Sequence, residues 1–182
     1  MEIKPWKRIS TTPVGDFRVF SLRTDRVVSP RTQHEHEVYV LDCVNWVNVI
    51  ALTPDRQMVM IDQYRHGSRT VELEIPGGMM DAHDGSPVAA GLRELREETG
   101  YEGENARVIG QLFPNPAIMN NACATILVEN CRCVCPVNLD HGEDLSTRLV
   151  PAAEVPRMVA EGRIKHSLVV AAIYYFELWQ RG

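Results

Sequence analysis

The sequence lacks a long apolar run, a block of like charge and an internal repeat. The longest apolar stretch without a charge, residues 167–176, has ten residues, and the first ten residues include Glu2 and Lys4 instead of a signal-peptide core. We therefore expect no membrane insertion. Nineteen basic residues against 24 acidic ones, dispersed along the chain, give a net charge of −5, so the basic footprint of a nucleic-acid-binding protein is also missing.

Cysteine is scarce and odd in number, with five residues in a chain of 182. A chain of this length forms one domain, or one domain with a short arm, and needs no disulfide framework. A reducing compartment, the cytoplasm, is the expected location. Cys131, Cys133 and Cys135 have the alternating spacing of a strand, which favours packed thiols over a zinc site.

The pattern of apolar residues predicts a strand-rich first half and helices near the end. Short β-branched and apolar runs indicate strands over residues 38–41, 44–52, 58–62, 70–74, 107–112 and 122–129. Ser86 as N-cap, Pro87 at the first helical position and Gly100 after the last turn delimit a helix of about 13 residues. Two further helices are expected over 153–161 and 167–180. A mixed sheet covered by helices, in the α+β class, follows.

Three carboxylates share one face of the helix that begins after Ser86. Glu94, Glu97 and Glu98 have the i, i+3, i+4 spacing, and the like-charge pair costs the helix about 0.2–0.5 kcal/mol. Another face carries the stripe expected to be buried, which consists of Val88, Leu92, Leu95 and Thr99. Two interpretations stay open: a bound cation, or a solvated acidic face neutralised by Arg93 and Arg96.

Small residues accompany the glutamates. Ala90 and Gly91 lie on the acidic arc, which would let a bulky polyanion approach the helix. Gly77 and Gly78 permit a backbone turn that brings a carbonyl close to the carboxylates. Carboxylates, a carbonyl and room for phosphate are typical of a site for a hard divalent cation such as Mg²⁺. The pattern predicts phosphoryl or pyrophosphoryl chemistry.

The segment Arg93-Glu-Leu-Arg-Glu-Glu-Thr-Gly-Tyr101 resembles the second half of the Nudix box, and Gly78 resembles its opening glycine. The box has a glutamate between them, where this chain has Asp84 after a loop one residue longer. Further segments are similar to the ADP-ribose and nucleoside-diphosphate-sugar pyrophosphatases of this family, namely residues 46–53, 63–65, 73–78, 115–119 and 162–166. The resemblance covers about residues 38–178.

The resemblance implies a fold and an assembly. Residues 41–182 would form the Nudix domain, an α/β/α sandwich around a mixed central sheet. Residues 1–40 would form an N-terminal arm of strands that contacts a second copy in a homodimer. No nucleic acid or membrane partner is implied.

The resemblance also implies roles for particular residues. Arg93 would orient the carboxylates, Glu97, Glu98 and Glu143 would act in catalysis, and Glu143 would orient or deprotonate water. Family members often carry a second acid where this chain has His141, which leaves the general base open. The Mg²⁺ ligands, with Mn²⁺ as a substitute, would be Gly77, Glu94, Glu97, Glu98 and Glu143. The substrate-binding residues would be Arg65, Glu74, Met119 and Asn120.

The implied reaction is metal-dependent hydrolysis of the pyrophosphate bond in ADP-ribose or a related nucleoside diphosphate sugar. The products would be a nucleoside monophosphate and a sugar phosphate. Two alternatives stay open: a Nudix hydrolase of nucleoside triphosphates or dinucleoside polyphosphates, and a Nudix module that binds a nucleotide sugar without cleaving it.

Overall fold

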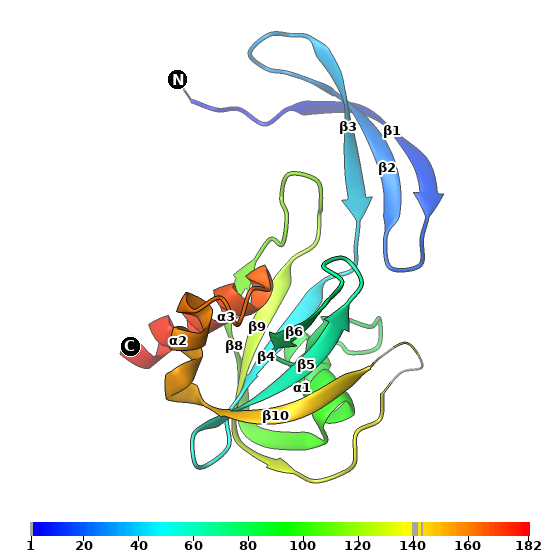
Figure 1. The fold of residues 1–182 in the computed structure, drawn as a ribbon. Helices are drawn as coiled ribbons and strands as arrows, with labels where there is room; N and C mark the ends of the chain where they lie inside the picture. The colour runs from blue at the N-terminus through cyan, green and yellow to red at the C-terminus, as the bar shows by residue number, and fades with distance from the viewer. Residues whose placement is uncertain (1, 140–141, 143) are drawn as a thin grey trace. The chain divides into compact units, whose positions relative to one another are not determined.

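The structure of the chain is a computed structural model that describes residues 2–139, 142 and 144–182. The chain forms two compact units, drawn in Figure 1 and treated separately below. The first comprises Met1–Val44 and Phe113–Ala122, and the second comprises Asn45–Leu112 and Cys123–Gly182. The first unit thus reaches past the expected end of the arm and includes a segment from the middle of the chain.

The N-terminal unit is an antiparallel sheet of β1 (Lys7–Asp16), β2 (Ser21–Val28) and β3 (Glu35–Asp42) in that order. Asp25 is its most buried charged residue, at 5% exposed. It accepts a hydrogen bond from the Thr11 hydroxyl and pairs with Arg23. The Thr11 bond, together with Arg23, lowers the pKa of Asp25. The segment before Ala122 joins this unit because the Leu41 amide donates to the Ile118 carbonyl, 2.7 Å away.

The second unit contains two sheets and three α-helices. Its strands are β4 (Trp46–Ala51), β5 (Gln57–Arg65), β6 (Thr70–Glu74), β7 (Gly77–Met79), β8 (Tyr101–Leu112), β9 (Cys123–Cys133) and β10 (Leu145–Pro151). Its helices are α1 (Pro87–Thr99), a 3₁₀ turn at Ala152–Glu154, α2 (Val155–Ala160) and α3 (Ser167–Arg181). The strand orders are β7-β4-β9-β8 and β10-β5-β6. Among the described strands of this unit, only β4 and β9 pair in parallel, so the first sheet is mixed.

Side-chain alternation along the central strands separates two cores. Val47, Val49 and Ala51 of β4 pack on the side of α1, with Ala90 and Leu95 of that helix. The residues between them face α2 and α3: Ile50 and Leu52 join a cluster that contains Val155, Met158, Ile173 and Phe176. Because both faces of the strands are covered, the unit is an α/β/α sandwich. This confirms the expected fold class.

Helix α1 begins and ends at the residues that the sequence predicts. Its buried face differs in part from the predicted stripe. The Ser86 hydroxyl accepts from the Ala89 amide at 3.1 Å, and Gly100 adopts the left-handed conformation with φ 72°. The buried residues are Ala90, Gly91, Glu94, Leu95, Glu98 and Thr99, while Val88 and Leu92 of the expected stripe stay half-exposed. The helix therefore turns its acidic arc inward.

Gly91 does not leave room for a polyanion, which corrects that expectation. A Cβ at this position would lie 2.9 Å from Cγ1 of Ile126 and 3.3 Å from Cγ2 of Val49. The small residue lets α1 lie close against the sheet, so its cost in helix propensity, about 1 kcal/mol, serves packing.

Several strands could not be placed from local pattern. β10 was not expected, and Gly77 and Gly78 form the short strand β7 instead of a turn. Consecutive antiparallel pairing holds for β5 and β6, whereas β4 takes its partners β7 and β9 from farther along the chain.

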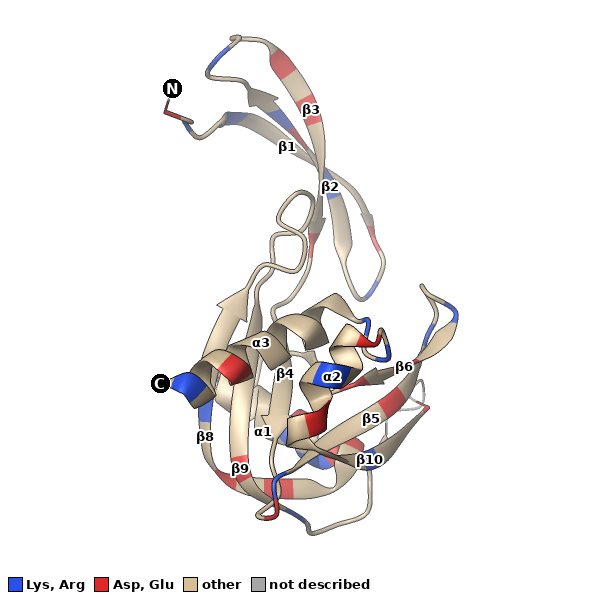
Figure 2. Cartoon of the chain, turned by 60° about the vertical axis from the view of Figure 1, so that its left-hand side comes forward, with Lys and Arg blue, Asp and Glu red and all other residues tan. Residues whose placement is uncertain are grey.

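Charge is distributed without segregation. Figure 2 shows basic and acidic residues interspersed along the described parts of both units. No helix among the described residues is long and apolar enough to span a bilayer.

Two glycines with the same backbone conformation give a matched test of the packing at the end of α1. Gly85 and Gly100 both have φ 72°, but a Cβ at Gly100 would lie 2.0 Å from the Cys135 carbonyl oxygen, and one at Gly85 would meet nothing within 4 Å. Gly85→Ala should cost about 1–2 kcal/mol from the left-handed backbone alone. Gly100→Ala should cost about 1–3 kcal/mol more, because the backbone of residue 135 has to move. Urea unfolding measures both, and equal losses would contradict the packing described.

Candidate active site

The candidate site forms where β7 meets α1. β7 pairs with β4 so that Gly77 lies opposite Asn48 and Gly78 opposite Val47. A Cβ at Gly78 would lie 2.6 Å from Oε1 of Glu94, so the Glu94 carboxylate occupies the space that any side chain there would need. The two glycines bring the backbone close to the carboxylates from a strand edge instead of a turn, and the Gly77 group that contacts a glutamate is the amide, where a carbonyl was expected.

The three glutamates of α1 differ in burial and partners. Glu98 is 2% exposed, and its Oε2 accepts a hydrogen bond from the Gly77 amide at 2.9 Å. Glu94 is 8% exposed and lies 3.0 Å from Nη1 of Arg93. The Glu97 side chain is 39% exposed and accepts from the same Arg93 nitrogen at 2.9 Å. Two of the three carboxylates are thus buried, and the solvated acidic face is excluded.

Arg93 is the cation that holds this acidic set. Its Nε and Nη2 donate to the two oxygens of Asp84 at 2.9 and 3.1 Å, and Nη2 also donates to the Met79 carbonyl. The bond with Asp84 is the main reason that the pKa of Arg93 is raised. Arg96, the other cation considered for neutralisation, instead pairs with Glu102 at 2.9 Å.

Asp84, which stands where the Nudix box has a glutamate, contacts Arg93 although its loop is one residue longer and its side chain shorter. Its side chain is 3% exposed, and besides Arg93 it accepts from the Asp81 amide at 2.7 Å. These bonds, the one with Arg93 foremost, lower the pKa of Asp84. The Asp84 amide also donates to the Asp81 carbonyl at 3.1 Å, so a turn over positions 81–84 presents the carboxylate to the guanidinium.

The donor set suits a hard divalent cation, since it offers only carboxylate and backbone oxygens beside the two glycines of β7. In the described parts of the chain, no three carboxylate, imidazole or thiol groups are already arranged around one point. The reason is visible in the contacts: Glu97 turns to Arg93, and Glu98 turns to the Gly77 amide. A cation would have to draw these carboxylates from their N–H partners.

Arg65 and Glu74 form a second charged element on β5 and β6. Nε and Nη2 of Arg65 donate to the two oxygens of Glu74 at 2.7 and 2.8 Å. The Glu74 side chain is 3% exposed and that of Arg65 is 40% exposed. A bidentate pair of this kind fixes the guanidinium while leaving part of it accessible.

The remaining predicted residues belong to the other unit or lie outside the described residues. Met119 and Asn120 are part of the N-terminal unit, where Met119 bridges to Leu41 of β3. The Asn120 amide group contacts the Cys43 backbone amide and the Asp42 carboxylate. Glu143 and His141 lie outside the described residues.

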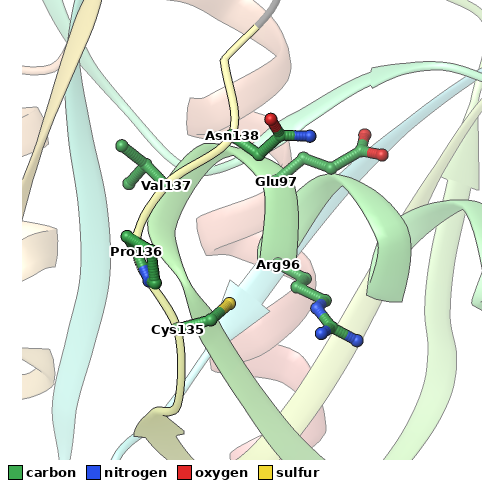
Figure 3. Close-up of a pocket in the computed structure, with 6 residues that line it drawn as sticks. All are labelled: Arg96, Glu97, Cys135, Pro136, Val137 and Asn138. Carbon is green, nitrogen blue, oxygen red and sulfur yellow. The ribbon is translucent and has the colours of Figure 1, made fainter.

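A shallow pocket lies beside the last turns of α1. It has a volume of about 520 Å³ and is lined by Arg96, Glu97, Cys135, Pro136, Val137 and Asn138. Figure 3 shows the Glu97 and Asn138 side chains at one end of it. The Asn138 amide donates to the Glu97 carbonyl at 2.8 Å and so ties the segment after β9 to the helix. The sequence did not predict this contact, because a hydrogen bond between two backbone groups does not depend on which side chains are present.

Comparison with known proteins identifies the family. The NUDIX domain model matches residues 44–168, more than half of the chain. The protein belongs to the Nudix family. The match includes β4 to the start of α3, and therefore the whole acidic site on α1.

Three similar proteins extend the comparison. The chain is 27% identical over 175 residues to an ADP-ribose pyrophosphatase of Mycobacterium tuberculosis, covering 92% of this chain and 81% of that protein. It is 30% identical over 173 residues to a methanol dehydrogenase activator of Bacillus methanolicus, covering 94% and 92%. A crystal structure of an ADP compounds hydrolase superposes with a TM-score of 0.86 at 16% identity over 100% of this chain and 97% of the other. This likeness confirms the fold.

The contact of Asp84 with Arg93 predicts a pH-dependent contribution to stability. Because the folded pKa of Asp84 lies below its ordinary value of 3.8, this contribution is fully present above pH 3.8 and is lost as the pH falls through the folded pKa. Asp84→Asn should lower the melting temperature at pH 7, with a difference from the wild type that shrinks below pH 4. Asp81→Asn is the matched control, since its side chain is 54% exposed and lies 3.8 Å from Arg93. Thermal unfolding at several pH values measures both, and equal losses would contradict the assignment.

Proposed function

We propose that this Nudix protein hydrolyses the pyrophosphate bond of ADP-ribose or a related nucleoside diphosphate sugar, giving a nucleoside monophosphate and a sugar phosphate. The observation that carries the proposal is the acidic set on α1, held by Arg93 and adjoining Gly77 and Gly78 of β7. The similarity to an ADP-ribose pyrophosphatase over 92% of the chain supports the substrate class.

A divalent cation, Mg²⁺ with Mn²⁺ as a substitute, would be held by Glu94, Glu97, Glu98, the Gly77 carbonyl and Glu143. Bound there, such an ion supplies charge neutralisation and a water of lowered pKa. The residues of the chain supply the positioning. Arg93 keeps Glu94 and Glu97 within reach of one another, and the Gly77 amide fixes the Glu98 carboxylate. Glu143 would take the proton from water that attacks phosphorus.

Arg65 would bind the phosphates or a ribose of the substrate. Its Nε and Nη2 are occupied by Glu74, which sets the plane of the guanidinium, and its side chain remains 40% exposed. A planar, oriented guanidinium recognises phosphate oxygens with little further loss of side-chain entropy. Met119 and Asn120 are proposed to line the sugar pocket, on the strength of the family resemblance alone.

The proposal extends to assembly and location. Every residue of β1 from Lys7 to Val14 is exposed, including the apolar Ile9 and Val14, so this strand offers a surface for a second copy in a homodimer. All five cysteines are free thiols, which suits the reducing cytoplasm.

A substrate panel tests the activity. With Mg²⁺ present, the protein should cleave ADP-ribose and other diphosphate sugars in preference to nucleoside triphosphates, and chelation should abolish cleavage. Glu98→Gln should lower kcat at least about 100-fold, because it removes a proposed ligand charge while its amide oxygen can still accept from Gly77. Glu102→Gln is the control, since Glu102 lies on β8, pairs with Arg96 and has a side chain that is 47% exposed.

Two results of the panel would contradict the proposal. Preferential cleavage of triphosphates or dinucleoside polyphosphates would place the protein in another branch of the family. Binding of a nucleotide sugar without cleavage would make it a sensor module.

Light scattering at micromolar concentration tests the homodimer. Two chains of 20.5 kDa should give a mass near 41 kDa, and Ile9→Asp together with Val14→Asp should shift it towards one chain, because buried charge opposes association. A mass of one chain for the wild type would refute the dimer.

A further inference from the structure

One face of the β10-β5-β6 sheet carries a row of polar side chains. Two of them, Gln63 and Thr147, have no part in the roles proposed above. The register places Thr147 of β10 and Glu74 of β6 on either side of Ile61. Gln63, two residues along β5, therefore points to the same face as these three. Val59, two residues in the other direction, packs with Ala90 and Leu95 of α1. The row thus lies on the side of the sheet that faces the acidic helix.

Two atoms of this row are buried without a hydrogen-bond partner among the residues that the structure describes. They are Oε1 of Gln63 and Oγ1 of Thr147, each shielded from solvent although the residues themselves are half-exposed. Leaving a buried polar atom unpaired costs about 1–3 kcal/mol, and native structures contain few such atoms. Two of them on neighbouring positions of one sheet face require an explanation.

The Arg65 side chain, which pairs with Glu74, lies along the same row. Arg65 lies opposite Thr70, whereas its partner Glu74 lies opposite Ile61, four residues back along β5. To make its two bonds with Glu74, the Arg65 side chain must run back along the strand past Gln63. The guanidinium of Arg65 therefore lies over the same face of the sheet as the Gln63 amide.

The chemistry of the unpaired atoms selects the kind of ligand. The Gln63 oxygen accepts hydrogen bonds only, and the Thr147 hydroxyl both accepts and donates. An ionised phosphate offers acceptors and no donor, so it cannot satisfy the Gln63 oxygen. A sugar hydroxyl donates and accepts, and it is neutral.

We propose that Gln63 and Thr147 bind a ribose hydroxyl of the substrate and so contribute to its selection. The inference rests on the proposed hydrolysis of a diphosphate sugar and adds two residues to it. Arg65 binds the phosphates or ribose beside them, so the row from β6 to β10 contacts adjoining parts of one ligand. Gln63 and Thr147 act here as specificity residues and take no part in bond cleavage.

The test combines variants with substrate analogues. Gln63→Leu and Thr147→Val preserve shape and remove the polar atoms, and Ser146→Ala is the control, because Ser146 is exposed on the opposite face of β10. The substrates are ADP-ribose and two of its monodeoxy analogues, each lacking the 2-hydroxyl of a different ribose. kcat/KM is measured for the wild type and each variant with each substrate, and the melting temperature is measured for each protein.

Both specificity variants should lose about 10-fold or more in kcat/KM with ADP-ribose, while Ser146→Ala matches the wild type. With one deoxy analogue, the wild type should show the same loss and the variants no further loss, because the bond is already missing. The melting temperature should stay unchanged or rise, since an unpaired buried atom has been replaced by an apolar one. This result separates ligand binding from a structural role.

Wild-type rates in both variants, or equal additional losses with both analogues, would overturn the inference and leave the proposed function standing. If the wild type cleaves no diphosphate sugar at all, the proposed function fails and the inference fails with it. The rate at which the wild-type protein cleaves ADP-ribose distinguishes these two cases.

Discussion

The ion contacts of Arg93 are the constraint on which the site depends. Helix α1 carries Glu94 and Glu98 one turn apart and buries both, an arrangement that like-charge repulsion and desolvation oppose. Arg93 offsets this by contacting Asp84, Glu94 and Glu97 together, and the Gly77 amide offsets it at Glu98. The same contacts tie the loop before α1 to the helix, so the local fold and the charge distribution of the site have a common origin.

The packing behind α1 makes this arrangement rigid. Ala90 and Gly91 bring the helix close to β4 and β9, and Gly78 brings β7 close to the Glu94 carboxylate. Small residues on both sides therefore determine where the glutamates lie, without themselves taking part in chemistry. The Arg65–Glu74 pair applies the same principle on the other sheet, where a buried carboxylate orients a half-exposed guanidinium. The proposed binding of a cation and an anionic diphosphate requires carboxylates and a guanidinium that are positioned in this way.

Local signals predicted the parts of the structure that local interactions determine. The bounds of α1 followed from Ser86, Pro87 and Gly100, and the strand at Thr70–Glu74 followed from its composition. The parallel pairing of β4 with β9 could not be predicted, because residues about 77 positions apart meet only through the tertiary fold. The prediction that Gly91 leaves room for a polyanion was wrong for a related reason. Its close neighbours Val49 and Ile126 lie on β4 and β9, far from α1 in the sequence. The Nudix pattern located the glutamates. The bonds that Arg93 makes to Asp84 and the Met79 carbonyl could not be predicted from it, because they depend on how the loop before α1 folds back on the helix.

Hydrolysis of ADP-ribose in ¹⁸O-enriched water, followed by mass spectrometry of the products, tests the central claim most directly. Attack of water on phosphorus within the pyrophosphate should yield AMP and ribose 5-phosphate, with one ¹⁸O atom in the phosphate of one product and none in the other. Release of orthophosphate, label in a sugar hydroxyl, or recovery of intact ADP-ribose would contradict the account of this site as a pyrophosphohydrolase centre.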